Sequence, residues 1–472
     1  MRSGYRLAIH WFRRDLRLRD NTALHRATQS AEQVLPVYII SQWKGHHRWT
    51  GAARQSFLCG SLESLKRNVS AAGGHLIFRR GEAVEELKRL IRETKADAVF
   101  TNRDPDPHGI RTEAKVEKMC RELGVAFETC KDVVLHERAE VLTGSGGPYR
   151  VFTPYNKVWQ AAEKPAVAPS VRVLHSPHGI HSLDGPTLET WKLPPGTADI
   201  PEPGERAARE RMKRALSSVL PHYEQSRNTP HGHTTSRLSV DLRHGTIGIR
   251  ELYHRTAALL AESKEAAVRK SLQTYLNELA WREFYMQILW HFPEVLEHEF
   301  DPKYRGLPWS YDDKKLQRWK DGMTGFPIVD AGMRELRATG FMHNRVRMIT
   351  AMFLTKDLHL DWRLGEEYFM QMLVDGEIAS NNGGWQWSAG TGADAAPYFR
   401  IQNPWSQTKS YDPDGKYIRQ WVPELKDAPP AALLAPPEPG LFRGAKDYPL
   451  PMVDHGAERD RTLAIFKKHL AH

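Results

Sequence analysis

Short apolar strands alternate with amphipathic helices through the first 135 residues, and this alternation limits the possible folds more than any other feature. Strands are predicted at residues 6–12, 34–40, 75–78 and 97–101. Helical periodicity fills residues 54–72, 82–95 and 113–123. The alternation predicts a parallel, doubly wound α/β sheet. No GxGxxG motif follows the first strand, so the dinucleotide fingerprint of common oxidoreductases is missing.

The remainder of the chain is organised differently. Residues 136–205 are rich in proline, histidine and serine, which is typical of a connector lying over a surface. From residue 206 onward helical periodicity dominates. We therefore predict an α/β domain at residues 1–135, a connector at residues 136–205 and a larger all-α domain at residues 206–472.

Composition restricts the partners and the compartment. The formal net charge is +10, which favours an anionic partner, with nucleic acid first; a basic surface without such a partner is the alternative. Three cysteines without metal-ligand spacing suit a reducing compartment. No apolar run approaches the roughly 20 residues that span a bilayer, and no signal-peptide core follows the first Met. We expect a cytoplasmic protein, associated with the nucleoid in a bacterium or nuclear in a eukaryote.

The segment at residues 375–387 gathers acids, amides, paired glycines and two tryptophans. Glycine lets a backbone approach a flat ligand closely, and an indole offers a large π face with one hydrogen-bond donor. A tight turn beneath two core tryptophans accounts for the same residues, so composition alone leaves both interpretations open.

The run Thr-Thr-Ser-Arg-Leu-Ser at residues 234–239 combines hydroxyls, backbone N–H groups and one arginine. Such a run can form a cradle for an anion. Hydroxyl residues are also common helix caps, and the run by itself does not separate the two possibilities.

Two helical segments carry polar groups on one face. In the first, Glu278, Trp281, Arg282 and Tyr285 stand at i, i+3, i+4 and i+7. An acid, an indole and a guanidinium together suit a polar, aromatic ligand, while a salt-bridged surface is the alternative.

In the second segment, residues 343–357, Asn344, Arg347 and Met348 share a face. An amide can donate and accept hydrogen bonds at a base or flavin edge, and a thioether offers a soft apolar contact. Arg345 is expected to face away from these three residues and to contact a DNA phosphate.

These segments closely resemble the DNA photolyase and cryptochrome family, above all its class I cyclobutane pyrimidine dimer photolyases. The resemblance runs from HWFRRDLRLRDN at residues 10–21 to IRQWVPE at residues 418–424, which is most of the chain. It implies an antenna-type α/β domain and an all-helical domain that binds FAD. The flavin contacts that it implies are Tyr223, Thr235, Ser236, Leu238, Ser239, Arg282, Asn344, Arg347, Asp375, Glu377 and Asn381.

This sequence departs from the family at two places near the flavin contacts. Glu377 stands where the family usually has aspartate, and residues 240–246 replace the commoner Ser-Pro continuation. Asn381 resembles the residue that faces flavin N5, where plant-type cryptochromes carry aspartate.

The resemblance also implies a pocket for a flipped-out pyrimidine dimer. Trp281 and Trp387 are its implied walls, and Glu278 the hydrogen-bond partner of the 5′ base, able to stabilise the dimer radical anion. Enzymes for (6-4) photoproducts carry histidines at the positions of Asn344 and Met348, because their reaction needs proton transfer. An amide and a thioether there favour the cyclobutane dimer.

Trp385, Trp362 and Trp309 match the family's electron-hopping chain between flavin and surface, with Trp309 at the solvent end. An indole suits this role because it can lose and regain an electron without breaking bonds. Packing in a core is the alternative that the sequence alone leaves open.

One further segment is a candidate site for a second chromophore. Residues 102–110 follow a predicted strand, where α/β sheets bind ligands. The segment is more similar to the deazaflavin- or flavin-type antenna pattern than to the folate type, and an empty loop is the alternative. His-Gly-His at residues 231–233 lacks companion ligands, so no metal is expected.

The resemblance predicts a light-driven enzyme that repairs cyclobutane pyrimidine dimers in UV-damaged DNA, acting as a monomer without a membrane. The alternatives are a cryptochrome-type blue-light photoreceptor, a (6-4) photolyase and a non-catalytic DNA-binding module. The end of the chain at His472, without a long signalling tail, counts against the photoreceptor.

Overall fold

The computed structural model describes residues 4–42, 47–232, 234–437 and 447–471. Their contacts form two compact units. The first unit comprises residues 1–196, 201–222 and 236–293, and the second comprises residues 197–200, 223–235 and 294–472. The predicted division near residue 205 stays a prediction, since a compact unit need not coincide with a domain of common ancestry.

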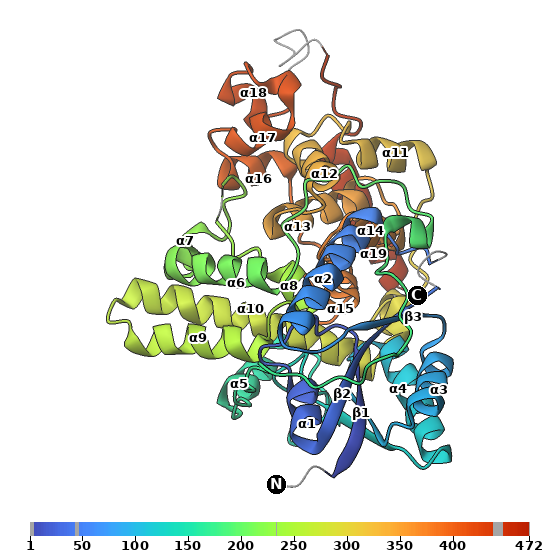
Figure 1. Ribbon diagram of the computed structural model, residues 1–472. Coiled ribbons are helices and arrows are strands. Elements are labelled where there is room, and N and C mark those ends of the chain that lie inside the picture. Colours follow the sequence, from blue (N-terminus) through green and yellow to red (C-terminus); the bar gives the residue numbers. More distant parts are fainter. Residues whose placement is uncertain (1–3, 43–46, 233, 438–446, 472) are drawn as a thin grey trace. The chain divides into compact units, whose positions relative to one another are not determined.

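A five-stranded sheet forms the centre of the first unit (Figure 1). Its strands are β1 (Tyr5–Phe12), β2 (Ala31–Ile40), β3 (Ile77–Arg80), β4 (Ala98–Asn102) and β5 (Ala126–Cys130). They run parallel in the order β3-β2-β1-β4-β5. The predicted parallel α/β sheet is confirmed, and β5 is a strand that the sequence analysis did not foresee.

Alternation along β1 sends side chains to both faces of the sheet. Ala8 and Phe12 pack with helices α1 (Thr22–Ser30) and α2 (Ala52–Ala71). Leu7 and Ile9 pack on the other face with α3 (Ala83–Thr94) and α4 (Pro107–Glu122). The sheet is therefore covered by helices on both sides, which is the doubly wound arrangement.

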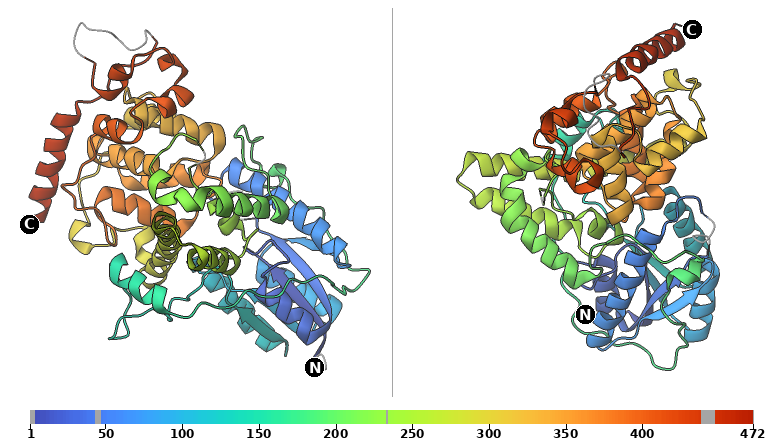
Figure 2. Two further views of the ribbon diagram at one scale, coloured as in Figure 1. Left: turned by 90° about the vertical axis from the view of Figure 1, so that its left-hand side faces the viewer. Right: turned by 90° about the horizontal axis from the view of Figure 1, so that it is seen from above.

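The first unit continues beyond the sheet into helices. These are α5 (Phe152–Ala161), α6 (Glu205–Arg214), α8 (Ser239–His244), α9 (Ile249–Glu262) and α10 (Ala266–His291). A short loop joins α9 to α10, and the two lie side by side (Figures 1 and 2).

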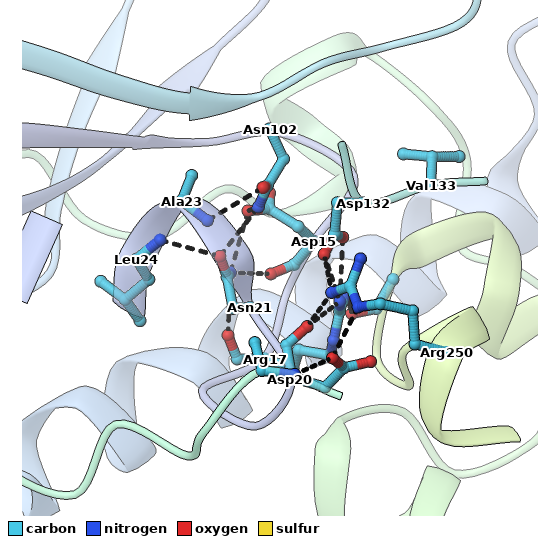
Figure 3. A network of polar contacts seen from close by, with 12 residues as sticks. Asp15, Arg17, Asp20, Asn21, Ala23, Leu24, Asn102, Asp132, Val133 and Arg250 are labelled. Atoms are coloured by element: carbon cyan, nitrogen blue, oxygen red, sulfur yellow. Dashed lines mark hydrogen bonds and ion pairs between the residues drawn. The ribbon is translucent and has the colours of Figure 1, made fainter. Parts of the chain in front are cut away.

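A buried charge cluster ties α9 to the loops of the sheet (Figure 3). Arg250 pairs with Asp20 at 2.8 Å and with Asp132 at 2.6 Å, and Arg17 pairs with Asp132 at 2.7 Å. All four side chains are 1–2% exposed. Removing one partner of such a buried set leaves an uncompensated charge, so the cluster explains why α9 belongs to the same compact unit as the sheet.

The second unit is built from helices, and the described residues after β5 form no strand beyond a single bridge between Ser310 and Leu360. Its helices are α7 (Tyr223–Ser226), α11 (Asp313–Asp321), α12 (Pro327–Thr339), α13 (Asn344–Met352), α14 (Trp362–Met372), α15 (Ile378–Ala389), α16 (Pro404–Tyr411), α17 (Lys416–Trp421), α18 (Pro430–Leu434) and α19 (His455–Leu470), the last drawn red in Figure 2. The predicted all-α character is confirmed.

Short 3-10 and π turns complete the chain, at Leu188–Trp191, Ala215–Val219, Leu220–His222, Pro293–Leu296, Pro302–Tyr304, Phe353–Asp357 and Pro423–Leu425. The core of the second unit is rich in aromatic rings, and Trp319, Trp362 and Trp385 are at most 2% exposed. No helix among the described residues is long and apolar enough to cross a bilayer.

Candidate functional site

The first unit contributes one half-buried face of α10. The ring of Trp281 stacks on Phe152 of α5, with centroids 3.7 Å apart and planes 9° apart. Arg282 donates from Nη1 to the carbonyl oxygen of Val133 at 2.8 Å. Glu278 is half-buried on the same face. Because Phe152 covers one side of the Trp281 ring, a stacked base can use only the other side.

The run at residues 234–239 is divided between the two units. Ser236, Leu238 and Ser239 belong to the first unit, whereas Thr235 belongs to the second, as does Tyr223. In the first unit the hydroxyl of Ser236 accepts hydrogen bonds from the Tyr275 hydroxyl at 3.1 Å and from the Leu238 N–H at 3.4 Å. Arg237 between them has a positive φ of 56°, which is uncommon for a residue other than glycine.

In the second unit, α13 and the turn before α15 meet through an ion pair. Arg347 donates from Nη2 to Asp375 at 2.9 Å, and from Nε to the carbonyl oxygen of Met342 at 2.7 Å. The Asp375 side chain is 3% exposed and that of Arg347 is 24% exposed. The pair therefore presents a guanidinium held in one orientation at a partly open surface.

Asn344 and Met348 lie together one turn apart on α13, with Nδ2 and Sδ separated by 3.9 Å. The expectation that Arg345 faces away from them is wrong. Its Nη1 lies 3.7 Å from Met348 Sδ, while Nη2 donates to Asn228 at 2.8 Å and the guanidinium lies 4.5 Å from the centre of the Tyr411 ring. Residues at i and i+3 share a helix face, which accounts for the contact.

Helix α15 holds the remaining predicted flavin contacts. Glu377 caps its first turn, accepting from the Ser380 N–H at 3.4 Å, and Asn381 donates from Nδ2 to the carbonyl oxygen of Glu366 at 3.0 Å. An ideal Cβ at Gly384 would meet nothing within 4 Å among the described residues. A flat ring could therefore approach this helix closely, as the paired glycines suggest. Trp387, on the same helix, is half-buried.

The three tryptophans predicted to carry electrons share one core. Trp362 and Trp385 belong to it, and Trp309 is partly buried against it. The carboxylate oxygen Oε1 of Glu299 accepts from Nε1 of Trp309 at 3.1 Å and from Nε1 of Trp362 at 3.2 Å. Glu299 thus accepts hydrogen bonds from two of these three indoles.

The side chains of each unit include donors that suit the FAD implied by the resemblance. Hydroxyls and N–H groups at residues 236–239 suit a diphosphate, and the Arg347–Asp375 pair with the Asn381 amide suits the polar edges of a flavin ring. Within each unit the chemistry of the donors fits the cofactor.

The predicted antenna segment is occupied by its own side chains. Arg14 pairs with Asp104 and with Asp106, each at 3.0 Å, and Arg13 pairs with Asp104 and Glu113. Burial raises the pKa of Asp104, but Arg14 and Arg13 outweigh it and hold that pKa at about 2. Asp104 is therefore ionised, with Arg13 and Arg14 as its charge partners.

The ends of β1 and β4 are filled as well (Figure 3). Asn102 donates to Asp15 at 2.7 Å and to Asn21 at 2.8 Å, and all three residues are buried. This is the topological switch point, where an α/β sheet commonly binds a ligand. Polar side chains of the chain itself therefore fill this position.

Comparison with known proteins shows which proteins have similar sequences. Residues 8–171 match the sequence profile described as DNA photolyase, and residues 275–468 match the one described as the FAD binding domain of DNA photolyase. A deoxyribodipyrimidine photo-lyase of Agrobacterium fabrum is 40% identical over 97% of each chain, and that of Escherichia coli is 39% identical over 97% of this chain and 98% of its own. The chain belongs to the DNA photolyase family.

Solved structures of the family have the same fold. A bacterial class III photolyase from Agrobacterium tumefaciens superposes with a TM-score of 0.90, at 38% identity over 100% of this chain and 99% of its own. An archaeal photolyase from Sulfolobus tokodaii with two FAD molecules gives 0.84 at 31% identity, covering 98% and 100%. A cryptochrome from Synechocystis gives 0.89 at 28% identity, covering 98% and 100%. Assignment to class I stays a prediction.

Three residues that the sequence did not single out hydrogen-bond near predicted site residues. Tyr275 holds Ser236, Glu299 joins two tryptophans, and the buried Glu283 accepts from the Trp159 indole at 2.7 Å and from the N–H of His136 at 3.1 Å. Glu283 stands among apolar residues on the packed face of α10. An acid in an apolar stripe is a detectable signal, because such a charge is buried only when it has partners.

A metal site is not evident in the part of the chain that the structure describes, where no group of three or more His, Cys, Asp and Glu could hold an ion. His233 of the His-Gly-His motif lies outside the described residues.

Proposed function

We propose that this member of the photolyase family is a light-driven lyase that splits cyclobutane pyrimidine dimers in DNA. The observation that carries the proposal is the contact between Asn344 and Met348 beside the Arg347–Asp375 pair. Neither an amide nor a thioether carries a proton that it can release near neutral pH. A substrate that requires proton transfer at this face is disfavoured, whereas a dimer that is opened by electron transfer is not.

The residues around the cofactor hold and orient it. Ser236 and Ser239 would bind the diphosphate, and Arg347, fixed by Asp375, would supply positive charge to the flavin ring. Asn381 would orient the ring through its amide, and Glu377, in the first turn of α15, would be a further contact. When bound in its reduced form, FAD supplies one electron on absorbing light.

The residues around the substrate act on a dimer that has left the DNA stack. Flipping costs less for a lesion whose stacking and pairing are already damaged. Trp281, which stacks on Phe152 of the same unit, would stack on the dimer, and the resemblance implies Trp387 as a second stacking partner. Glu278 hydrogen-bonds the 5′ base edge and stabilises charge that develops on it.

The net charge of +10 suits a DNA partner whose binding weakens as salt rises. Arg345 serves a nearby phosphate in this proposal. The protein acts as a monomer in the cytoplasm, on the nucleoid in a bacterium or in the nucleus of a eukaryote. A deazaflavin- or flavin-type antenna stays a prediction, which the absorbance of the purified protein tests.

The direct test is light-dependent repair of an oligonucleotide that carries one thymine dimer. We expect restored thymines in blue light and none in the dark. The structural similarity to a cryptochrome gives the signalling alternative its basis. Protein that contains reducible FAD but restores no thymines in light would support that alternative and contradict the lyase.

A further inference from the structure

Glu299 joins the outer two tryptophans of the predicted electron-hopping chain. Its Oε1 accepts from the indole N–H of Trp309 at 3.1 Å and from that of Trp362 at 3.2 Å. The Glu299 residue is 3% exposed. A single carboxylate oxygen, largely removed from water, therefore contacts both indoles.

The carboxylate belongs to a small charge cluster. Arg363 donates from Nη2 to Glu299 Oε2 at 3.2 Å and from Nη1 to Asp361 at 3.1 Å. Its guanidinium also lies 4.5 Å from the centre of the Trp362 ring, where a positive charge opposes oxidation of the indole. Arg363 is shared between Glu299 and Asp361, so it does not neutralise either carboxylate alone.

Glu299 stays ionised at neutral pH. Burial raises its pKa, but the hydrogen bonds and charge of Arg363 together with the Trp309 N–H outweigh burial and hold the pKa below its ordinary value. The negative charge beside the two indoles is therefore permanent under ordinary conditions.

The inner tryptophan lacks this support. Trp385 Nε1 is buried and has no hydrogen-bond acceptor among the described residues. Its ring neighbours are Phe369, at 4.9 Å between centroids, and Trp319, at 6.1 Å. An oxidised indole carries a positive charge, which a hydrogen-bonded carboxylate stabilises strongly where water is excluded.

We propose that Glu299 is a positioning residue for electron transfer, whose carboxylate stabilises the oxidised indoles of Trp362 and Trp309 and so draws positive charge away from Trp385. The inference rests on the proposed function and on the predicted electron-hopping chain, in which these tryptophans resupply electrons to the flavin. With oxidised FAD bound, one electron would pass from Trp385 to the light-excited flavin, Trp362 would replace the electron of Trp385, and Trp309 would replace that of Trp362. A thiol reductant in solution returns one electron to Trp309, so charge and electrons balance.

Glu299→Gln tests the inference in the FAD-loaded protein. The substitution keeps the size and one acceptor oxygen but removes the charge. Transient absorption after a flash measures the yield of the long-lived tryptophan radical. Loss of one charge-assisted hydrogen bond predicts a fall on the order of tenfold. Glu299→Asp, which keeps the charge, is expected to recover most of the yield, and a packing defect would not respond in this way.

Glu424→Gln is the matched control. Glu424 is also paired with an arginine of the second unit, Arg334 at 2.7 Å, and its side-chain hydrogen bonds among the described residues come from that arginine and not from an indole. The radical yield of this variant is expected to stay within about twofold of the wild type, because the substitution removes no hydrogen bond to an indole. An equal fall in both glutamine variants would assign the effect to general destabilisation and overturn the inference.

Trp362→Phe separates the inference from its premise. If this variant loses the radical while Glu299→Gln keeps the wild-type yield, the chain stands and the role of Glu299 is wrong. If Trp362→Phe keeps the radical yield, electrons take another path, and both the predicted electron-hopping chain and the proposed role of Glu299 are wrong. Chemical reduction of the flavin makes electron supply through the tryptophans unnecessary. Dimer repair by chemically reduced wild-type protein therefore tests the proposed lyase activity separately.

Discussion

Asp375 determines whether the guanidinium of Arg347 is held in place. The acid is almost fully buried, and both of its oxygens lie within 3.1 Å of the same Arg347 nitrogen. A buried hydrogen bond between charged groups contributes more than a neutral one, and loss of one partner leaves the other without compensation. The charge beside the proposed flavin ring therefore depends on this one carboxylate.

Asp375→Asn is expected to lower the free energy of unfolding by about 1–3 kcal/mol, because Arg347 keeps its charge and loses its counter-ion. The variant should also retain less FAD on purification. Urea unfolding and the absorbance ratio of flavin to protein measure the two effects. Asp414→Asn is the control, since Asp414 pairs with Lys416 at an exposed position, and its effect should be below about 0.5 kcal/mol. Equal effects of the two substitutions would contradict this account.

Some contacts of single side chains could be predicted from the sequence, and others could not. The spacing of Asn344 and Met348 on α13 predicted correctly that they lie together, because residues at i and i+4 share a helix face. The same spacing gave the wrong direction for Arg345, whose long side chain bends toward Met348 and Asn228. The link through Glu299 joins residues far apart in the chain, and no local pattern reports such a contact.

Helices α14 and α15 approach each other closely because a glycine faces a tryptophan. An ideal Cβ at Gly365 would lie 2.0 Å from Cη2 of Trp385. That distance leaves no room for a methyl group. By contrast, Gly384 of α15 faces open space among the described residues.

We expect Gly365→Ala to destabilise the protein by about 1–3 kcal/mol, because crowding exceeds the gain in helix propensity. Gly384→Ala should instead stabilise the FAD-free protein by roughly 0.5–1 kcal/mol, since propensity acts there without crowding. Thermal unfolding of both variants gives the comparison. A stabilising Gly365→Ala would show that the contact with Trp385 is looser than described.

The π turn Phe353–Asp357 meets α19 through a buried lysine. Lys356 is 1% exposed, donates to the carbonyl oxygen of Ala389 at 2.7 Å and lies 3.9 Å from the centre of the Phe466 ring. Burial lowers the pKa of Lys356 to about 7. From about pH 7 to the ordinary lysine pKa, the unfolded chain holds a proton that the folded chain lacks, so this group makes stability rise with pH.

Lys356→Met is expected to remove that rise, which is at most about 1.4 kcal/mol per pH unit. Urea unfolding of both proteins between about pH 7 and pH 10 measures the difference. Asp357 does not interfere: burial raises its pKa to about 6, so its contribution falls away between about pH 4 and pH 6. A difference between the two proteins that is constant from pH 7 to pH 10 would show that Lys356 titrates normally.

At the scale of the element, the alternation of strands and helices was enough to predict a parallel sheet, and the helical pattern after residue 206 was enough to predict the all-α character. Strand β5 was not predicted because four of its five residues are only partly buried, so its sequence has no continuous apolar run. The predicted helix at residues 343–357 is α13 followed by a π turn, a change of hydrogen bonding that apolar periodicity does not reveal.

For the whole molecule, membership of the DNA photolyase family rests on relatives that cover nearly the entire chain. The similarity extends to a cryptochrome structure, so fold alone does not separate repair from signalling. The side chains of α13 carry that distinction, because Asn344 and Met348 cannot supply a proton. We propose that this face accepts a cyclobutane dimer and acts on it in light.

The measurement that tests the claim uses purified protein with chemically reduced FAD and two oligonucleotides, one with a single thymine cyclobutane dimer and one with a single (6-4) photoproduct. Chromatography of restored thymines, in blue light and in the dark, reports repair of each. We expect light-dependent repair of the cyclobutane dimer alone. Repair of the (6-4) lesion, or of neither lesion, would contradict the proposal.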